Sequence, residues 1–250
     1  MPVRESEAII LRSFPLGEGD RLVSFLSRSE GRVRGVASGA RKPKSRFSSS
    51  LEPLSYIRIW FYEKETRDLV RISQCEIIES FWEAQSDYTA GLVLALACEV
   101  TEVILGEREV ADANFRLLLL FARYIKSGGD LQIALAYFAL WTVRLGGWLP
   151  NFDRCANCGA QLPDDGYISD RDGLLCVNCR LPGQRSISRA ALTIAQRMLA
   201  TSLEKLMQDG IFRAEQMAEL KDYMLDVIEQ HAEKKLHTRR LLRESAETLP

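Results

Sequence analysis

The sequence predicts a multi-domain protein with two successive architectures, a small closed β-sheet and then an all-α part that carries a cysteine-rich insert. Roughly the first 80 residues consist of short runs rich in Ile, Val, Phe and Leu that alternate with turn-like stretches. Beyond Trp82 the apolar residues recur at helical spacing instead. We therefore expect an N-terminal domain over residues 1–80 and a helical domain over residues 81–250, with the insert at about residues 150–182.

Five runs form the predicted sheet, and they cover residues 7–14, 21–27, 32–38, 56–62 and 69–80. The stretches between them contain the Gly, Pro and Ser residues that favour turns. No helix-length apolar pattern separates the runs, so a βαβ unit is disfavoured and a small closed barrel is favoured.

The fourth run alternates strictly between two kinds of side chain. Ile57, Ile59 and Phe61 would point into a barrel. The opposite face is aromatic and cationic, as the stacking of nucleic-acid bases requires, and it comprises Tyr56, Arg58, Trp60 and Tyr62. The alternative is that this face packs against the helical domain.

Three aspartates each precede an apolar run of helical length. Asp87, Asp112 and Asp130 are expected to cap helices that extend to about residues 105, 126 and 145. Glycine pairs at 128–129 and 146–147 supply the left-handed conformation that often ends a helix. Apolar residues lie on nearly all sides of these helices, which predicts that they are buried.

The bulk composition disfavours several classes of protein. With 46% hydrophobic and 27% charged residues, the 250-residue chain has an ordinary globular balance, and its net charge is −1. No apolar run approaches the roughly 20 residues of a membrane span, and the N-terminus does not resemble a secretory signal. We therefore expect a cytoplasmic protein with no membrane partner, associated with the nucleoid if it binds DNA. Any nucleic-acid signal must come from local charge.

Four cysteines form two Cys-x-x-Cys pairs, Cys155 with Cys158 and Cys176 with Cys179, and 17 residues separate the pairs. Each pair can aim two thiolates at one point, and the residues between the pairs can fold back as a hairpin, which predicts a tetrahedral zinc site. A catalytic zinc ion would keep one coordination position open and would usually recruit histidine or a carboxylate. The only two histidines of the chain lie far away in sequence. The zinc site is therefore expected to be structural.

A basic segment interrupts the otherwise neutral chain. Residues 28–46 contain seven cations and one acid, Glu30, so the local charge is seven minus one, or +6. Gly39 and Pro43 make its second half a flexible loop, which suits an irregular phosphate backbone. The alternative is a solvated loop that only keeps the protein soluble. Together with a five-stranded barrel, the loop favours an OB-fold, which commonly binds single strands.

Several stretches give the chain a family resemblance. They are Leu-Gly-Glu-Gly-Asp-Arg-Leu over residues 16–22, the basic segment over 31–46, Leu-Gly-Gly-Trp-Leu-Pro-Asn-Phe over 145–152 and Lys-Leu-His-Thr-Arg over 235–239. In this order they resemble RecO, a family of bacterial recombination mediators, over most of the chain. The resemblance implies an N-terminal OB-fold, a helical domain and a four-cysteine zinc element. It also implies binding to single- and double-stranded DNA, annealing of complementary strands and, with RecR, loading of RecA onto DNA coated by single-strand-binding protein, whose C-terminal tail is a further partner.

The resemblance also assigns individual residues. Its DNA contacts fall on six cations, which are Arg32, Arg34, Arg41, Lys42, Lys44 and Arg46. Its zinc ligands fall on the two cysteine pairs. Weaker candidates for DNA contact are Arg58 and Trp60 on the fourth strand and, near the end of the chain, Lys235, Arg239 and Arg243. The last three share one stripe if their helix is continuous, and a solvated helix face is the alternative for them.

Two other functions are weighed against this one. A zinc-ribbon module that binds RNA or protein, for example in transcription, would explain the cysteines and leave the loop a solubilising role. An enzyme is disfavoured, because the Gly17-Glu18-Gly19 turn lacks a following Gly-Lys-Ser/Thr and no Gly-x-Ser-x-Gly or His-Glu-x-x-His pattern occurs. The favoured prediction is a non-enzymatic, DNA-binding recombination mediator.

Overall fold

The computed structural model describes residues 3–63, 68–169, 173–203, 205–206 and 212–248. Contacts divide the chain into two compact units. The first comprises Met1–Gly129 with Leu236–Pro250, and the second comprises Asp130–Lys235. Strands give way to helices after residue 79, within the first unit. The expected division into domains of residues 1–80 and 81–250 stays a prediction.

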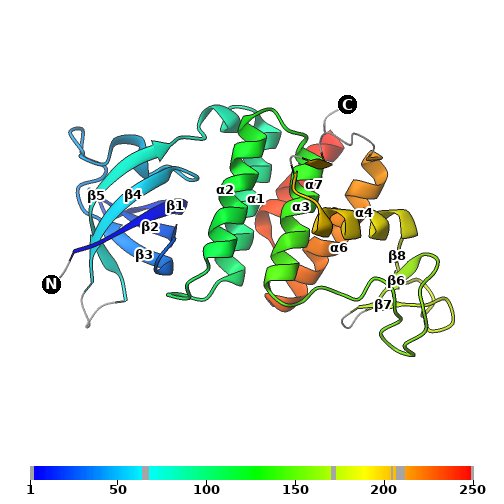
Figure 1. The fold of residues 1–250 in the computed structure, drawn as a ribbon. Coiled ribbons are helices and arrows are strands. Elements are labelled where there is room, and N and C mark those ends of the chain that lie inside the picture. The colour runs from blue at the N-terminus through cyan, green and yellow to red at the C-terminus, as the bar shows by residue number, and fades with distance from the viewer. Residues whose placement is uncertain (1–2, 64–67, 170–172, 204, 207–211, 249–250) are drawn as a thin grey trace. The chain divides into compact units, whose positions relative to one another are not determined.

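Five strands close the barrel of the first unit (Figure 1). They are β1 (Val3–Leu16), β2 (Asp20–Ser27), β3 (Gly31–Ala37), β4 (Tyr56–Tyr62) and β5 (Val70–Glu79). β1 pairs with both β2 and β4, and β3 pairs with β5 in parallel, which gives the order β1-β2-β3-β5-β4. This is the five-stranded barrel of an OB-fold, and it confirms the predicted fold.

The barrel interior is filled by alternate residues of the strands. Ile57, Ile59 and Phe61 on β4 are fully buried, as their period of two predicts. Phe25 on β2 packs edge-on against Phe61, with the ring centroids 5.7 Å apart. Phe47, which follows the basic loop, belongs to the same core. The end of the basic loop is therefore anchored in the barrel.

α1 (Tyr88–Ile104) is the first long helix of the chain, and it follows two short 3-10 turns, η1 (Ser48–Leu51) and η2 (Glu83–Gln85). The side chain of Asp87 accepts a hydrogen bond from the backbone amide of Ala90 at 2.7 Å. The predicted cap is therefore confirmed, because this bond satisfies one of the free amides of the first turn.

α2 (Asp112–Lys126) begins differently from the prediction. Ala111 occupies the cap position, and no side chain bonds to the free amides there. The prediction that Asp112 caps this helix is therefore wrong. The Asp112 carboxylate lies in the first turn instead, where it pairs with Arg28 and with Arg116 at 3.0 Å each.

The chain between α1 and α2 lies against β3. The amide of Arg108 donates a hydrogen bond to the carbonyl of Arg32 at 2.9 Å. Gly31 has a φ of 71°, and a Cβ at this position would lie 1.8 Å from the carbonyl oxygen of Glu109. Only glycine fits here, because the conformation is left-handed and the space is already filled. This contact joins the helices to the barrel.

A buried carboxylate on α1 receives the end of the chain. Glu99 is only 4% exposed, and its two oxygens accept hydrogen bonds from the amides of His237 and Thr238 at 2.9 and 2.8 Å. These amides open α7 (His237–Thr248), so Glu99 caps a helix that is remote in sequence. Burial would raise the pKa of Glu99, but the Thr238 side chain and the two amides hold the pKa below its ordinary value.

The second unit is built on helices and a small sheet (Figure 1). α3 (Leu131–Leu145) and α4 (Arg189–Ala200) both pack against α6 (Ala214–His231). Asp130 caps α3 as predicted, because its side chain accepts hydrogen bonds from two amides of the first turn. Among the described residues, no helix is both long enough and apolar enough to cross a membrane.

The cysteine-bearing insert contains three short strands. β6 (Gly166–Ile168) lies between β7 (Leu174–Leu175) and β8 (Ser186–Ile187), and all pairs are antiparallel. The hairpin predicted between the two cysteine pairs is therefore confirmed in β6 and β7. Residues 170–172 of its turn lie outside the described residues.

The Glu99 contact generates the first prediction, for the variant Glu99→Gln. One amide oxygen replaces two carboxylate oxygens, so one amide of α7 loses its acceptor, and we expect the free energy of unfolding to fall by about 1–3 kcal/mol at pH 7. The folded-state pKa of Glu99 is lowered, so its stabilisation is present above the unfolded value of about 4.5 and is lost as pH falls through the folded value. Calorimetric melting of both proteins between pH 7 and pH 3 checks this.

The matched control is Glu18→Gln, which removes the same charge from an exposed turn. Its melting temperature should follow that of the unaltered protein at every pH. A Glu99→Gln protein as stable as the control at pH 7 would contradict the proposed cap.

Candidate nucleic-acid interface and metal centre

The basic loop is folded onto the turn between β1 and β2. The amide of Arg41 donates to the carbonyl of Gly19 at 3.0 Å, and its guanidinium donates to the carbonyl of Gly17 at 2.8 Å. The amide of Gly39 donates to the carboxylate of Asp20 at 2.8 Å. The loop predicted to be flexible is therefore tied to the barrel where it begins, in addition to its anchor in the core where it ends.

Four cations of this loop are exposed, and they are Arg41, Lys42, Lys44 and Arg46. Within the part of the chain that the structure describes, none of the four forms an ion pair with a carboxylate. The guanidinium of Arg46 lies over the ring of Phe47, 5.1 Å from its centroid. These charges are therefore available to an anionic ligand.

Arg32 and Arg34 lie on β3, and both approach the carboxylate of Glu107. Arg34 forms an ion pair with it through Nε, and Nη1 of Arg32 lies 3.6 Å from the same oxygen. Nε of Arg32 also donates to the carbonyl of Leu105 at 2.9 Å. The six cations predicted to contact DNA thus divide into four exposed loop residues and two arginines held by the loop after α1.

Arg58 and Trp60 on β4 share a partner on β1. Nε1 of Trp60 donates to the carboxylate of Glu5 at 3.0 Å, and Nε of Arg58 lies 3.5 Å from it. Tyr56, on the same face of β4, is buried and packs edge-on against Phe115 of α2, with the ring centroids 6.0 Å apart. A helix therefore covers the Tyr56 end of this face. Arg58 is exposed, and Trp60 is half-buried.

The basic residues near the C-terminus do not share one helix. α6 ends at residue 231 and α7 begins at residue 237, so Lys235 lies in the connection, where it pairs with Glu229 at 2.8 Å. Arg239 is 4% exposed, whereas Arg243 is exposed. The three residues therefore do not form a single stripe, and the buried Arg239 offers little of its side chain to a ligand.

The four cysteines of the insert meet in one cluster. The Sγ atoms of Cys155, Cys158, Cys176 and Cys179 all lie within 4.8 Å of one another. Both pairs form tight turns: the amide of Gly159 donates to the carbonyl of Cys155 at 2.9 Å, and the amide of Cys179 donates to that of Cys176 at 3.0 Å. Four sulfurs at this spacing could hold one tetrahedral metal ion.

Backbone amides around Cys155 favour its thiolate. Burial would raise the pKa of Cys155, but the amides of Cys158, Cys176 and Asn157 lower it to about 6. At Cys158 the amide of Ala160 lowers the pKa, but the neighbouring thiols, led by Cys155, raise it to about 11. Cys155 is therefore easily deprotonated while Cys158 resists a second negative charge, as in a donor set that needs a cation to hold more than one thiolate.

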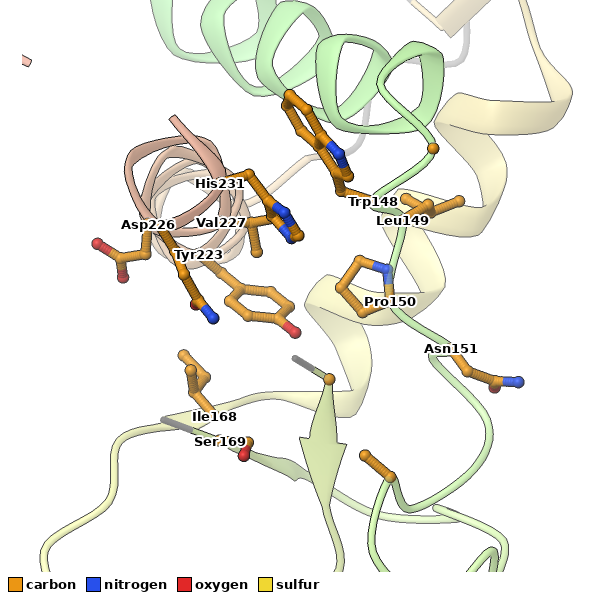
Figure 2. Close-up of a pocket in the computed structure, with 14 residues that line it drawn as sticks. Trp148, Leu149, Pro150, Asn151, Ile168, Ser169, Tyr223, Asp226, Val227 and His231 are labelled. Carbon is orange, nitrogen blue, oxygen red and sulfur yellow. The ribbon is translucent and has the colours of Figure 1, made fainter. Parts of the chain in front are cut away.

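A cavity of about 330 Å³ lies beside the insert in the second unit (Figure 2). Tyr223, Val227 and His231 reach it from α6, and the ring of His231 stacks on Trp148 with centroids 4.8 Å apart and 4° between the planes. The residues that line it include the acid Asp226 but no lysine or arginine. The cavity is therefore poorly matched to an acidic peptide. Sequence reasoning missed it, because its walls come from three separate segments.

The fold and the two sites define a class of protein, an OB-barrel protein with a helical continuation and a four-cysteine insert. Residues 1–81 match the family described as Recombination protein O N terminal, and residues 85–240 match Recombination protein O C terminal. The chain belongs to the RecO family, and this membership supports a role in DNA repair and recombination.

Individual relatives agree with the family match. DNA repair protein RecO of Koribacter versatilis is 35% identical over 237 residues, which cover 94% of this chain and 96% of that protein. The protein of the same name from Nocardioides sp. is 34% identical over 203 residues, covering 78% and 81% of the two chains. The one from Anaeromyxobacter sp. is 28% identical over 245 residues, with 94% of each chain covered. The resemblance found in the sequence is thereby confirmed.

The arrangement around Glu107 generates the second prediction, for the variant Glu107→Gln. Loss of the carboxylate frees Arg34 and loosens Arg32, so we expect affinity for single-stranded DNA to rise about 3- to 10-fold. The salt slope, which is the slope of log affinity against log salt concentration, should steepen by up to about 1.4. Fluorescence anisotropy of labelled oligonucleotides over a range of salt concentrations measures both quantities.

Glu109→Gln is the control, because it removes the same charge from the same exposed loop without an ion pair to Arg32 or Arg34. Adding Arg34→Ala to the Glu107→Gln protein should abolish most of the gain. Equal effects of the two glutamate variants would mean that β3 plays no part in DNA contact.

Proposed function

We propose that this protein is a DNA-binding recombination mediator that acts without catalysing a chemical reaction. It binds single- and double-stranded DNA, promotes annealing of complementary strands and, together with RecR, helps RecA to load onto DNA coated by single-strand-binding protein. The C-terminal tail of that protein is a direct partner and RecA an indirect one. This role places the protein in the cytoplasm with the nucleoid.

The observation that carries the proposal is the anchored loop with its four exposed cations. Phosphate contacts depend on charge and carry no sequence information, so such a loop suits a protein that must act on any DNA sequence. The basic loop rests on the β1–β2 turn. In OB-folds the loop between strands 1 and 2 commonly contacts oligonucleotides. Membership of the RecO family supports the same conclusion.

We also infer that the cysteine cluster holds a structural zinc ion. Four thiolates complete a tetrahedral shell and leave no position for water or substrate. A zinc ion there would join the turn that begins at Cys155 to the turn that begins at Cys176, directly after β7. It would thus supply a cross-link, in an insert whose strands are too short to be stable by themselves.

The third prediction concerns the loop variant in which Arg41, Lys42, Lys44 and Arg46 are all replaced by alanine. Four lost phosphate contacts at about 0.7 each should flatten the salt slope for single-stranded DNA by about 3 and weaken binding about 10- to 100-fold near 100 mM salt. The loss should be similar for oligonucleotides of different sequence. Strand annealing on DNA coated by single-strand-binding protein should fall in parallel.

A matched control replaces four exposed cations elsewhere, Arg116, Arg144, Arg154 and Lys205, and so removes the same charge. It should keep the slope of the unaltered protein. Unchanged DNA binding by the loop variant would refute the assignment of the loop. Absence of any DNA affinity in the unaltered protein would favour a protein-binding or RNA-binding module.

The fourth prediction concerns the metal. Atomic absorption should find one zinc ion per chain, and removing it, or making Cys176→Ser, should lower the melting temperature by about 5–10 °C. Affinity for single-stranded DNA at 25 °C should change less than about twofold, because the loop lies in the other unit. Asn178→Ser, an exposed position between the same two cysteines, is the control. A metal-free protein that melts at an unchanged temperature would contradict a structural zinc site.

A further inference from the structure

A second cavity, of about 580 Å³, lies in the first unit beyond the end of β5. Its walls come from the segment around η1 and from the segment around η2, which the fold brings together. The residues that line it are Ser49, Glu52, Pro53, Ser55, Ser80, Phe81, Trp82 and Gln85. Its volume is in the range of cavities that hold small organic groups.

Trp82 is the most exposed large apolar side chain of this cavity. It is 68% exposed, whereas the adjacent Phe81 is 1% exposed and forms part of the core. Lys126 lies over the Phe81 ring, 5.3 Å from its centroid, so Phe81 is held in place from behind. The indole of Trp82 is therefore an aromatic surface at the mouth of a cavity whose floor is fixed.

Apart from the apolar Pro53 and Phe81, the other lining groups are polar and uncharged, with one exception. Ser49, Ser55 and Ser80 bring hydroxyls, and Gln85 brings an amide whose Nε2 donates to the carbonyls of Pro53 at 3.3 Å and Phe81 at 3.5 Å. This leaves Oε1 of Gln85 as an acceptor without a partner in the described chain. A flat ligand with an apolar face and hydrogen-bonding edges matches such a lining.

Glu52 is the exception, and its charge is balanced. Its carboxylate lies 3.1 Å from the guanidinium of Arg21. Glu79, the last residue of β5, pairs with Arg123 at 2.8 Å and with Lys126 at 3.2 Å. Glu52 and Glu79 are thus neutralised within the protein, whereas Glu83, the residue after Trp82, is exposed and forms no ion pair among the described residues. Repulsion of an anionic strand at the mouth is therefore limited to one acid.

The cavity is continuous with the cationic loop along the chain. Arg46 is the last cation of the loop, Phe47 is buried in the barrel, and Ser49 already lines the cavity. Two residues lie between Arg46 and Ser49, so their Cα atoms are at most about 11 Å apart. The last cation of the loop therefore lies close to one wall of the cavity.

We propose that this cavity takes up a single unpaired nucleobase, which stacks on Trp82 while the loop cations hold the neighbouring phosphates. A base has a flat face that can stack on Trp82 and polar edges that can hydrogen-bond to the lining. Every base has such a face, so binding at this site should not depend on the DNA sequence. The inference rests on the proposed DNA binding by the loop. It adds a contact to the bases that the loop cations do not make.

Trp82→Ala tests the proposal directly. Stacking on an aromatic side chain contributes to the affinity for single strands, so the variant should bind an oligothymidine of about 20 nucleotides 5- to 150-fold more weakly. Its salt slope should stay unchanged, because no phosphate contact is removed. Trp82→Phe should keep most of the affinity. It should also lose the fluorescence quenching expected when a base stacks on Trp82, with Trp141 and Trp148 of the second unit as the internal reference.

Oligonucleotides that lack bases complete a double-mutant cycle. Abasic sites should weaken binding of the unaltered protein about as much as Trp82→Ala does, and should cost the Trp82→Ala protein little more. Because Trp82 is exposed, its truncation should leave the melting temperature unchanged, which separates lost stacking from lost folding.

The outcomes separate this inference from the function on which it rests. If the loop variant loses affinity and salt dependence but Trp82→Ala binds like the unaltered protein, the base site is overturned and the mediator function stands. If abasic sites weaken Trp82→Ala and the unaltered protein equally, the base site is overturned as well. If the loop variant binds normally, the proposed function of the loop fails, whatever Trp82 does. Normal DNA binding by Trp82→Ala combined with loss of an apolar peptide ligand would assign the cavity to a protein partner and overturn the base site.

Discussion

The first unit depends on Glu99, a carboxylate placed in the buried middle of α1. The chain leaves this unit after Gly129 and returns at Leu236. α7 therefore packs against a helix that is remote in sequence, and 138 positions separate His237 from Glu99. α7 has 12 residues, too few for a stable helix in water, and its first amides need acceptors. Glu99 supplies both oxygens. A buried carboxylate without those amides would be costly, so each partner requires the other.

The same helix also sets the position of the barrel. Glu102, one turn beyond the carboxylate that caps α7, lies 2.5 Å from Arg12 of β1. The chain after α1 then follows β3 so closely that Gly31 admits no side chain. This contact places Glu107 beside Arg32 and Arg34. A loop of the helical part therefore neutralises part of the charge that β3 can offer to a ligand. The four cations of the basic loop form no such ion pair among the described residues.

The sequence predicts the barrel well and the charge balance poorly, and the reason is physical. Strand positions follow from a period of two and from turn residues, both of which are local, so all five strands appear where predicted. Asp112 shows the limit of a local rule. It stands at the start of a helix as a cap would, but Arg28 from the β2–β3 turn takes its carboxylate. No local pattern reveals a partner so distant in sequence.

The candidate sites show the same division. The cysteine pairs were identified because their spacing is local within each pair and unusual in combination, and the four sulfurs do converge. The six cations were identified as a set, but the pairing of Arg32 and Arg34 with Glu107 depends on tertiary structure. The cavity at Trp82 was missed altogether. Two of its serines, Ser49 and Ser55, lie about 30 residues before Trp82 and form no motif with it.

Phosphate contacts and base contacts place opposite demands on a protein that anneals strands. Contacts to phosphates leave the base edges free to pair, and they weaken with salt because counterions are released on binding. A stacked base is withheld from pairing, and its binding energy depends little on salt. A surface of four cations beside a cavity that takes up one base would therefore hold a strand firmly while leaving most of its bases exposed. The one captured base would be surrendered only when the neighbouring bases have paired, because stacking within a new duplex then competes with stacking on Trp82.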